Sequence, residues 1–418
     1  MSKFSSKERS VAKFLNKYPK LKGKLKYFYQ YFTFQLHKKA YSFQIDERVS
    51  LKKISNDGIS SFWGYYDKTP NSGDNYCYHA LSDNLIRKRN SCTELDIYLN
   101  NHKISSTTSW NWQQGAMLTW LSESEIIHNF HDPANGYRAK IINVLNKNEI
   151  IINFPIYSVH KEKRIALTLN FNRLAKLRPD YGYFCEKFDQ TTKTDFNDGI
   201  SVIDLDSKEA KLVISFRKLL NFHSDQSMKN AWHKVNHIDF SPSGDRFMFH
   251  HRWFSDEGIK KSRLITANID GTDLHLLAND GMVSHCTWRG KDEIVGWMTK
   301  NDLGDKYFLL KDKTTDFSPF ADGLLCEDGH PGFSSDLEWM LTDTYPDKSR
   351  MSSILLYNLS SNKLYNIGEF FSPLKFTGEL RCDLHPRFNP CGNKITFDSV
   401  HEGVRGLYEL DITKIVNQ

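Results

Sequence analysis

Four histidines recur along the second half of the chain at the spacing of one repeating structural unit. They are His237, His285, His330 and His385, separated by 48, 45 and 55 residues, and each stands three positions before an aromatic residue. When such units are arranged around an axis, side chains at equivalent positions point into one shared space. Imidazole binds divalent metals and exchanges protons near neutral pH, so this register predicts a polar site with metal-binding or acid–base chemistry.

Charged residues accompany the histidines and define a candidate metal site. Asp383 lies two residues before His385, and Arg381 lies two residues before Asp383. Imidazole and carboxylate together are the ligand set of a borderline or hard divalent metal such as Mn²⁺. The predicted ligands are His285, His330, Asp383 and His385. The cation would neutralise a substrate carboxylate and acidify the neighbouring C–H bond. In the alternative interpretation, each histidine bonds to a neighbouring unit and holds a ring of units closed.

A second cluster suits the recognition of a sugar. The run from Ser109 to Gly115 holds two indoles and three amides in seven residues. Indole rings stack on the C–H face of a sugar, and amides pair with its hydroxyls. The predicted substrate-binding residues of this cluster are Trp110, Trp112, Gln113 and Gln114. The alternative is a structural role, with the tryptophans in a hydrophobic core and the amides bonded to loop backbone.

A long insertion, Asn170 to Thr194, could supply acid, base or carboxylate-clamping groups. Its candidates are Arg173, Arg178, Tyr181 and Tyr183, and Arg252 stands at a strand exit on the same predicted rim. The predicted catalytic set is His237, His330, Arg381, Arg173 and Tyr183. Within it, His237 or a rim tyrosine or arginine would accept a proton from the substrate. Arg178, Tyr181 and Arg252 are predicted to bind substrate.

The elements that position these residues are expected to be short strands. From about residue 50, β-branched and aromatic runs are interrupted every 8–12 residues by turn-forming residues. Three segments share one template: His237-Ile-Asp-Phe-Ser-Pro-Ser-Gly, His330-Pro-Gly-Phe-Ser-Ser-Asp-Leu and His385-Pro-Arg-Phe-Asn-Pro-Cys-Gly. In each, a strand follows the turn. The Ser-Pro-x-Gly turn suits a hairpin between two strands, because proline presets one backbone angle and glycine accepts the left-handed one.

Looser copies of the template bring the number of units to seven. The seven units begin near residues 55, 108, 153, 232, 281, 326 and 380, and residues 46–418 divided by seven give about 53 residues per unit, which suits a four-stranded propeller blade. The sequence therefore predicts an all-β protein: a seven-bladed β-propeller over residues 46–418. Helices are expected to be few, with one short candidate from Phe216 to Asn221.

The N-terminal segment, residues 1–45, differs from the rest in charge and in periodicity. Residues 1–40 hold eleven lysines and arginines and a single acid, whereas the remaining chain holds 45 basic and 49 acidic residues. Apolar residues at three- and four-residue steps predict a basic amphipathic helix between residues 5 and 40. Such a helix could lie on an anionic membrane surface. Alternatively, it packs on the propeller or docks a partner such as a glycosyltransferase.

The composition narrows the functional classes. The propeller region carries a slight excess of acids, so we do not expect it to bind nucleic acid. No apolar run reaches the roughly 18 residues of a membrane span, and no secretory signal is visible. Seven cysteines without framework spacing favour reduced thiols. These features predict a cytoplasmic protein, with peripheral association with the inner membrane as an added expectation.

Several motifs resemble known propellers. The His237 and His385 templates, His285-x-x-Trp and the stretch from Asp398 to Asp411 resemble oligogalacturonate lyases and their TolB-like relatives. The resemblance implies manganese held by three histidines and a glutamine, with His385 and His285 matching two of the ligands. This chain has Asp383 where a histidine is expected and Leu380 near the glutamine position. A fuller set of motifs resembles an uncharacterised bacterial group of propellers found in gene clusters for surface polysaccharides. These motifs are Phe62-Trp-Gly-Tyr-Tyr-Asp-Lys-Thr-Pro, Trp110-Asn-Trp-Gln-Gln-Gly and Asp328-Gly-His-Pro.

Three functional hypotheses follow. The leading one is a carbohydrate-active enzyme that cleaves an acidic, uronate-containing bacterial surface glycan by metal-assisted β-elimination. The first alternative is a glycosyltransferase or other biosynthetic enzyme of capsule or lipopolysaccharide assembly, which suits a cytoplasmic chain with a membrane-leaning basic helix. The second alternative is a non-catalytic propeller that scaffolds a polysaccharide-assembly complex. An acidic oligo- or polysaccharide is the expected partner under the leading hypothesis.

Overall fold

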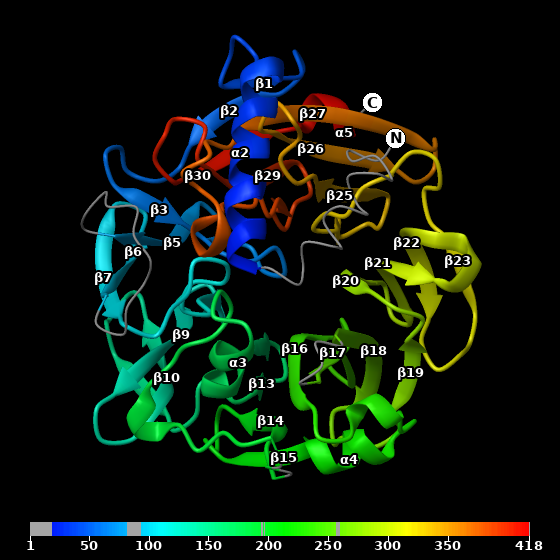
Figure 1. Cartoon of the computed structure of the whole chain (residues 1–418). Helices are drawn as coiled ribbons and strands as arrows, with labels where there is room; N and C mark the ends of the chain where they lie inside the picture. Colours follow the sequence, from blue (N-terminus) through cyan, green and yellow to red (C-terminus); the bar gives the residue numbers. More distant parts are fainter. Residues whose placement is uncertain (1–18, 82–92, 194, 196, 256–259, 418) are drawn as a thin grey trace.

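The computed structural model describes residues 19–81, 93–193, 195, 197–255 and 260–417. Seven antiparallel sheets stand around a central axis, and each contributes one blade of a ring (Figure 1). The predicted seven-bladed β-propeller is confirmed. The innermost strands of the blades begin near residues 60, 119, 158, 232, 283, 332 and 387, close to the seven predicted starts.

The first four blades each use four consecutive main strands. Blade one has β3 (Ser60–Phe62), β5 (Asn75–Leu81), β6 (Leu95–Leu99) and β7 (His102–Thr107), with β4 (Asn71–Ser72) beside β5. Blade two has β8 (Thr119–Trp120), β9 (Glu125–Asp132), β10 (Gly136–Asn143) and β11 (Glu149–Ile152). Blade three has β12 (Ser158–His160), β13 (Ile165–Thr168), β14 (Gly199–Asp204) and β15 (Ala210–Ser215). Blade four has β16 (Trp232–Phe240), β17 (Arg246–Phe254), β18 (Lys260–Asn268) and β19 (His275–Ala278).

The last three blades complete the ring. Blade five has β20 (Val283–Arg289), β21 (Glu293–Lys300), β22 (Gly304–Lys311) and β23 (Phe317–Pro319). Blade six has β24 (Gly332–Phe333), β25 (Trp339–Asp343), β26 (Met351–Asn358) and β27 (Lys363–Phe371). Blade seven has β28 (Arg387–Phe388), β29 (Lys394–Ser399) and β30 (Gly406–Asp411). The α-helices are α2 (Pro19–His37), α3 (Phe171–Leu177), α4 (Phe216–Asn221) and α5 (Thr413–Val416).

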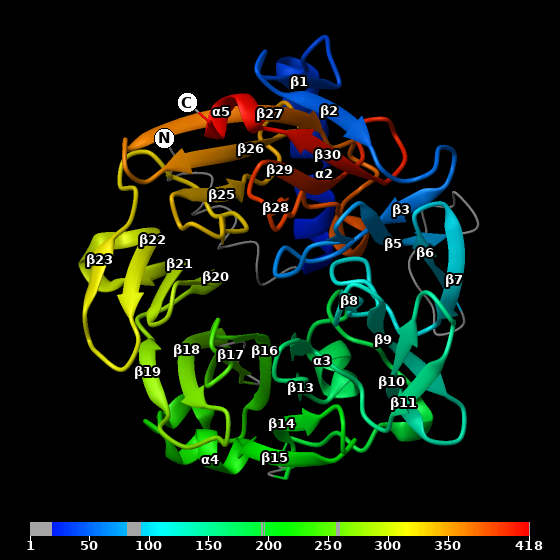
Figure 2. The same ribbon diagram turned by 180° about the vertical axis from the view of Figure 1, so that it is seen from behind.

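The chain closes the ring with two strands from its N-terminal part. Strand β2 (Ser50–Lys53) pairs with β30 as the outermost strand of blade seven. Strand β1 (Phe43–Ile45) pairs with β27 and adds a fifth strand to blade six. Figure 2 shows both strands beside the C-terminal blades. Because residues from the two ends of the chain share blade seven, neither end can leave its sheet without opening the ring.

The repeated turns have the predicted geometry. In blade four the Gly244 amide bonds to the Ser241 carbonyl, and Gly244 adopts a left-handed φ of +67°. Blade seven repeats this with Gly392 at +74°. In blade six the same position is Leu337, which adopts φ +61° without being glycine. Each turn joins the first two strands of its blade, and the apolar side chains of the second strand are buried in the sheet.

Helix α2 lies across one face of the ring (Figures 1 and 2). The helix contacts the propeller through Phe34, whose aromatic ring stacks on that of Phe371 with the two ring centroids 5.4 Å apart. Phe28, Phe32 and Leu36 remain 65–66% exposed. Among the helices of the described residues, none is both long and apolar enough to cross a membrane. Residues 1–18, which belong to the predicted basic helix, lie outside the described part of the chain.

Candidate functional site

The four register histidines converge along the innermost strands of blades four to seven. His237 and His285 lie within β16 and β20, and His330 and His385 lie two residues before β24 and β28. The imidazole centroids of His285 and His330 are 4.1 Å apart, and those of His330 and His385 are 4.2 Å apart. The centroid of His237 is 5.7 Å from that of His285. We call these four residues the histidine layer. Their proximity follows from the ring, because equivalent positions of adjacent blades meet at the axis.

Two members of the layer hold an unusual backbone conformation. His237 has φ +51° and His385 has φ +44°, in the left-handed region that non-glycine residues seldom occupy. In blade four, the pairing of β16 with β17 also shifts register between Asn236 and Asp239. Backbone strain of this kind costs about 1–3 kcal/mol and is concentrated at functional sites. The strain turns the two imidazoles out of the ladder and toward the axis.

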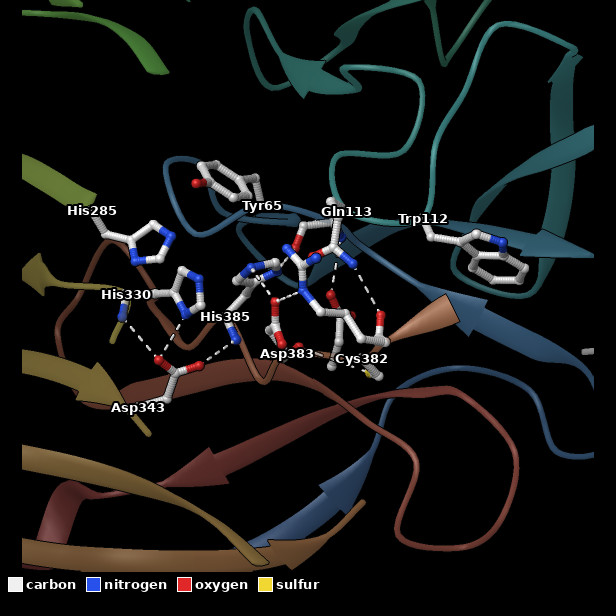
Figure 3. A network of polar contacts seen from close by, with 12 residues as sticks. Tyr65, Trp112, Gln113, His285, His330, Asp343, Cys382, Asp383 and His385 are labelled. Carbon is white, nitrogen blue, oxygen red and sulfur yellow. Dashed lines mark hydrogen bonds and ion pairs between the residues drawn. The ribbon is translucent and has the colours of Figure 1, made fainter. Parts of the chain in front are cut away.

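His330, Asp383 and His385 form a compact group suited to a metal ion. One potential ligand atom from each lies within 4.8 Å of the others, and all three residues are buried. Nδ1 of His330 lies 2.8 Å from a carboxylate oxygen of Asp343, and Nδ1 of His385 lies 2.7 Å from the carbonyl oxygen of Gly64. Figure 3 shows Asp343 beneath the two histidines, where its oxygens also accept the amides of His330 and His385.

These contacts leave the other ring nitrogens available. Since a carbonyl or carboxylate oxygen only accepts, each Nδ1 carries a proton, and in the neutral ring, which is the form that binds a metal, each Nε2 presents a lone pair. Nε2 of His330 and Nε2 of His385 are buried and have no hydrogen-bond partner among the described residues. A buried lone pair without a partner is costly. The pattern of an imidazole oriented by an oxygen on its far side is typical of metal ligands, so the group fits a divalent cation.

The predicted four-residue ligand set is therefore reduced to three in this geometry. His285 lies beside His330 but outside the compact group, and its Nδ1 pairs with Asp328 at 3.1 Å. Ser284 also donates to Asp328, at 2.6 Å. Leu380, which stands near the glutamine position of the lyases, packs against an apolar cluster around Phe62.

Neighbouring charges set the ionisation of the group. Burial opposes a charge on His330, but the carboxylates of Asp343, Asp383 and Asp328 outweigh it and raise the pKa of His330. Burial likewise opposes a charge on Asp383, yet Arg381 and His330 hold the pKa of Asp383 below its usual value. The result is an anionic Asp383 in the interior of the protein, which is the state that a cation requires of its ligand.

Arg381 holds Asp383 and links it to the long insertion. Its Nε donates to Asp383 at 2.8 Å, and its Nη1 donates to Asp180 at 2.8 Å. Nη2 donates to the hydroxyl of Tyr181 at 3.1 Å. Asp180 also accepts from Nε of Arg178, at 2.8 Å. The guanidinium of Arg381 is thus occupied by protein groups, so this predicted catalytic residue is placed to position Asp383.

The insertion divides into residues that reach the site and residues that do not. Tyr181 lies against His237, with ring centroids 5.9 Å apart. Arg173, on α3, is buried and pairs with Asp198 at 2.5 Å, away from the histidine layer. Tyr183 is fully buried and stacks on Phe171 at 4.3 Å. The prediction of direct catalytic roles for Arg173 and Tyr183 is corrected. Arg173 bonds to Asp198 and to the His233 carbonyl, and Tyr183 packs on Phe171 and accepts from Asn129 of blade two, so both side chains hold the insertion against its neighbouring blades.

The tryptophan cluster also serves the fold. Trp110 is 0% and Trp112 is 4% exposed, and both pack against Phe62 in an apolar cluster. Figure 3 shows Trp112 turned away from the histidines. Buried indoles cannot stack on a sugar, so the predicted sugar platform is corrected for these two residues. The amides of the same cluster bond to residues that support the histidine layer. Gln113 donates to the Arg381 carbonyl, and Gln114 donates to the Tyr157 hydroxyl.

Two tyrosines that the sequence analysis did not select complete the site. The Tyr65 hydroxyl lies 2.8 Å from Nδ1 of His237, and its ring is 5.0 Å from that of His385. The Tyr66 ring is 5.2 Å from that of His330. Burial raises the pKa of Tyr65 well above its usual value and lowers the pKa of His237 well below its own, so both are neutral. Their signal in the sequence was present: Tyr65-Tyr66 begins a loose copy of the histidine template.

Arg252, on β17, lines a cavity. Its Nη2 lies 3.0 Å from Nδ1 of His250 and donates to the Val283 carbonyl at 2.8 Å. The cavity has a volume of about 940 Å³ and also includes Arg178 and Lys234. Cavities of this size accommodate small ligands.

With its seven blades and its histidine layer at the axis, this protein is a seven-bladed β-propeller with a polar axial site. Among solved structures, oligogalacturonate lyase from Vibrio parahaemolyticus is similar to this chain, with a TM-score of 0.60 and 13% identity over 88% of this chain and 96% of that protein. TolB from Acinetobacter baumannii matches with a TM-score of 0.41 and 12% identity over 78% of each chain.

The likeness to the lyase confirms the fold that the motifs indicated, and at 13% identity it shows the fold alone. No family model matches the sequence, and no curated protein matches it. The chemistry of the site therefore has to be argued from its own residues.

Proposed function

We propose that this propeller cleaves an acidic, uronate-containing glycan by metal-assisted β-elimination. The observation that carries the proposal is the pair of buried, unpartnered Nε2 atoms of His330 and His385 beside the carboxylate of Asp383. The similarity to oligogalacturonate lyase in fold supports the same reaction class. A divalent cation bound by these three residues would neutralise the uronate carboxylate and make the adjacent C5–H bond more acidic.

The protein's own groups would perform the proton transfer. In the elimination, a base removes the C5 proton and the electron pair forms the C4=C5 double bond. The C4–O bond breaks, its electron pair stays on the oxygen of the leaving sugar, and that oxygen takes up a proton from solvent. His237 is the proposed base, because burial lowers its pKa and so keeps the imidazole unprotonated before the substrate binds. The hydroxyl of Tyr65, 2.8 Å from Nδ1, holds the ring of His237 in place. The hydroxyl of Tyr157 accepts the backbone amide of His237 at 2.9 Å and so fixes the backbone of His237.

The surroundings of the metal group would keep its geometry. Asp343 accepts hydrogen bonds from two backbone amides and one imidazole in the loops that carry His330 and His385. It thereby fixes the distance between these two loops. Arg381 holds Asp383 in the anionic form. We propose Asp343 and Arg381 as positioning residues, whose removal should weaken metal binding without removing a ligand.

Metal content of the purified protein, measured by elemental mass spectrometry, tests the proposal. We expect close to one divalent ion per chain, and His330→Ala and His385→Ala should each reduce it to a few per cent, because a two-ligand site loses most of its affinity. His102→Ala, on the outer strand of blade one, is the matched control and should leave the content unchanged. The loaded protein should release an unsaturated, ultraviolet-absorbing product from oligouronates.

A folded protein that binds no added Mn²⁺ or other divalent ion would overturn the proposal. So would a protein whose metal content is unaffected by both histidine changes. Circular dichroism of each variant separates loss of the ion from loss of the fold.

We further propose that α2 contacts an anionic membrane surface, which would place the enzyme near the assembly of a surface glycan. Phe28, Phe32 and Leu36 are exposed on this helix, as is Lys26, and the exposed Lys38 follows its last residue. Exposed aromatic and basic residues on one helix suit the interface of an anionic bilayer. The helix contacts the end of β27, which lies on the face where the innermost strands begin, so the same face would turn toward the membrane.

A further inference from the structure

A cavity of about 940 Å³ lies at the rim between blades four and five, next to the histidine layer. Its walls come from β16, β17 and β18, from the start of β20 and from the end of α3 in the long insertion. The cationic side chains that line it are Arg178, Lys234, Arg252, Lys260 and Lys261. None of the proposed metal ligands lines it.

Two of these cations have buried nitrogen atoms with nothing to bind. Lys234 is 1% exposed, and its Nζ has no hydrogen-bond partner among the described residues; its neighbour is the ring of Phe254, 5.5 Å from Nζ. Nε of Arg252 is also buried and lacks a partner within the described chain. A buried N–H donor without an acceptor is costly whether it is the amine of Lys234 or the guanidinium of Arg252, so it is retained where a ligand supplies the acceptor.

The acids around the cavity do not compensate these two residues. Asp225 pairs with Lys261 at 2.8 Å, and Asp280 pairs with Lys300 at 3.2 Å. Asp180, near Arg178, is shared with Arg381. The carboxylates within reach are therefore already bound to other cations, and the interior of the cavity keeps a positive excess.

We propose that this cavity is a binding site for an oxyanion, with Lys234 and Arg252 as its direct ligands and Arg178 at its edge. The group would be the carboxylate of an acidic sugar or the phosphate of a sugar nucleotide, both of which offer oxygen acceptors to buried N–H donors. The site stands on its own unpaired cations and does not depend on the metal.

Two chains of contacts connect the cavity to the histidine layer. Arg252 bonds to His250, whose ring centroid is 4.7 Å from that of His237. Ser284, on the cavity wall, donates to Asp328, the partner of His285. One elongated ligand could therefore place one anionic group in the cavity and another at the axis. If the proposed lyase activity holds, the cavity is the subsite for a neighbouring acidic sugar.

The ionisation of Lys234 gives the site a signature. Burial, followed by the positive charges of Arg252 and Arg178, lowers the pKa of Lys234 well below its usual value, while Asp180 opposes the shift and Lys260 adds to it. The free site thus holds a neutral amine, and a bound anion should draw a proton onto it. Binding measured by calorimetry in buffers of different ionisation enthalpy should report proton uptake near neutral pH.

Titration calorimetry on protein freed of metal with a chelator tests the site. The probes are a uronate disaccharide, a uridine-diphosphate sugar and inorganic phosphate. We expect one of the first two to bind, and Lys234→Met to weaken it by about 10- to 100-fold, the value of a charge-assisted hydrogen bond. Lys140→Met is the matched control, because Lys140 pairs with Glu149 on the outer strand of blade two. Arg252→Gln should weaken binding by a similar factor.

The stability of Lys234→Met provides a second readout. Removing an unpaired buried amine should raise the melting temperature by about 2 °C while binding is lost. Preference for the uronate would identify the sugar carboxylate as ligand, and preference for the nucleotide sugar would identify the phosphate. Absence of binding by all three probes, or equal binding by wild type and Lys234→Met, would overturn the inference. Because the assay excludes metal, its outcome is independent of the proposed elimination.

Discussion

Most of the buried histidines of this protein are neutral, and their ring nitrogens differ in what they bind. In His233 and His251 the rings bond to each other at 2.9 Å, and His251 is also held by Arg263, so they are part of the blade structure. In His330 and His385, Nδ1 is bonded and Nε2 is not. Nε2 of His131 and Nε2 of His250 are also unpartnered among the described residues, so at the scale of the residue it is two unsatisfied Nε2 atoms beside the carboxylate of Asp383 that mark the binding histidines.

Asp239 offers a prediction at the same scale. Burial and the negative charge of Asp67 raise the pKa of this carboxyl to about 7. Its folded pKa lies above its unfolded pKa, so its contribution to stability is complete at low pH and is lost as pH rises toward 7. Asp239→Asn should therefore be more stable than wild type at pH 8, by about 1–2 kcal/mol after allowance for partial exposure, and the difference should shrink at pH 5.

Urea unfolding of both proteins at the two pH values measures the effect. The prediction fails if the two proteins differ by the same amount at pH 5 and pH 8.

At the scale of the element, the turn that ends each repeat template sets the entry to the second strand. Gly244 and Gly392 occupy the same left-handed position in blades four and seven. They differ in their surroundings. A Cβ on Gly392 would meet only a Ser334 carbon, at 3.8 Å, whereas a Cβ on Gly244 would lie 2.6 Å from the imidazole of His160.

Alanine at these two positions should separate backbone strain from steric conflict. Gly392→Ala should cost about 1 kcal/mol through its positive φ alone. Gly244→Ala should cost at least twice as much, because the methyl group must also displace a buried ring. Denaturant unfolding of each variant gives the two values. Equal losses would show that the turn of blade four adapts around His160.

At the scale of the whole molecule, closure of the ring depends on residues far apart in the sequence. Ser50–Lys53 complete blade seven through β30, and Val49 is buried in the same apolar cluster as Ile412. Residues 1–40 contribute only surface contacts in the described part, chiefly Phe34 on Phe371 and Lys39 on Glu369.

Two truncations test this division. Deletion of residues 1–40 should leave a folded ring with a melting temperature within a few degrees of wild type but should abolish sedimentation with anionic vesicles. Deletion of residues 1–53 should expose the edge of β30 and lower the melting temperature by roughly 10 °C or more, with aggregation. Neutral vesicles are the control. Unchanged vesicle binding after the shorter deletion would contradict the membrane role of the helix.

The sequence by itself determined the architecture and the histidine register. The strand-and-turn texture, the three template copies and their spacing predicted seven blades, and Phe216–Asn221 is a helix as expected. These features are readable because they are local: a Ser-Pro-x-Gly turn and alternating apolar residues specify a hairpin without reference to the rest of the chain. Repetition then implies a ring, and the ring implies that equivalent histidines converge.

Only the tertiary structure decided which of those residues face the axis and which atoms remain unpaired. It separated Tyr181 from Tyr183, although they are two residues apart, because one side chain turns to His237 and the other to Phe171. It showed that Trp110 and Trp112 are buried, and it added Tyr65, Asp343 and Lys234 to the residues of the candidate sites. Spacing along a strand sets the side of the sheet, but burial and hydrogen-bond partners are set by neighbouring blades, whose contacts span up to hundreds of residues.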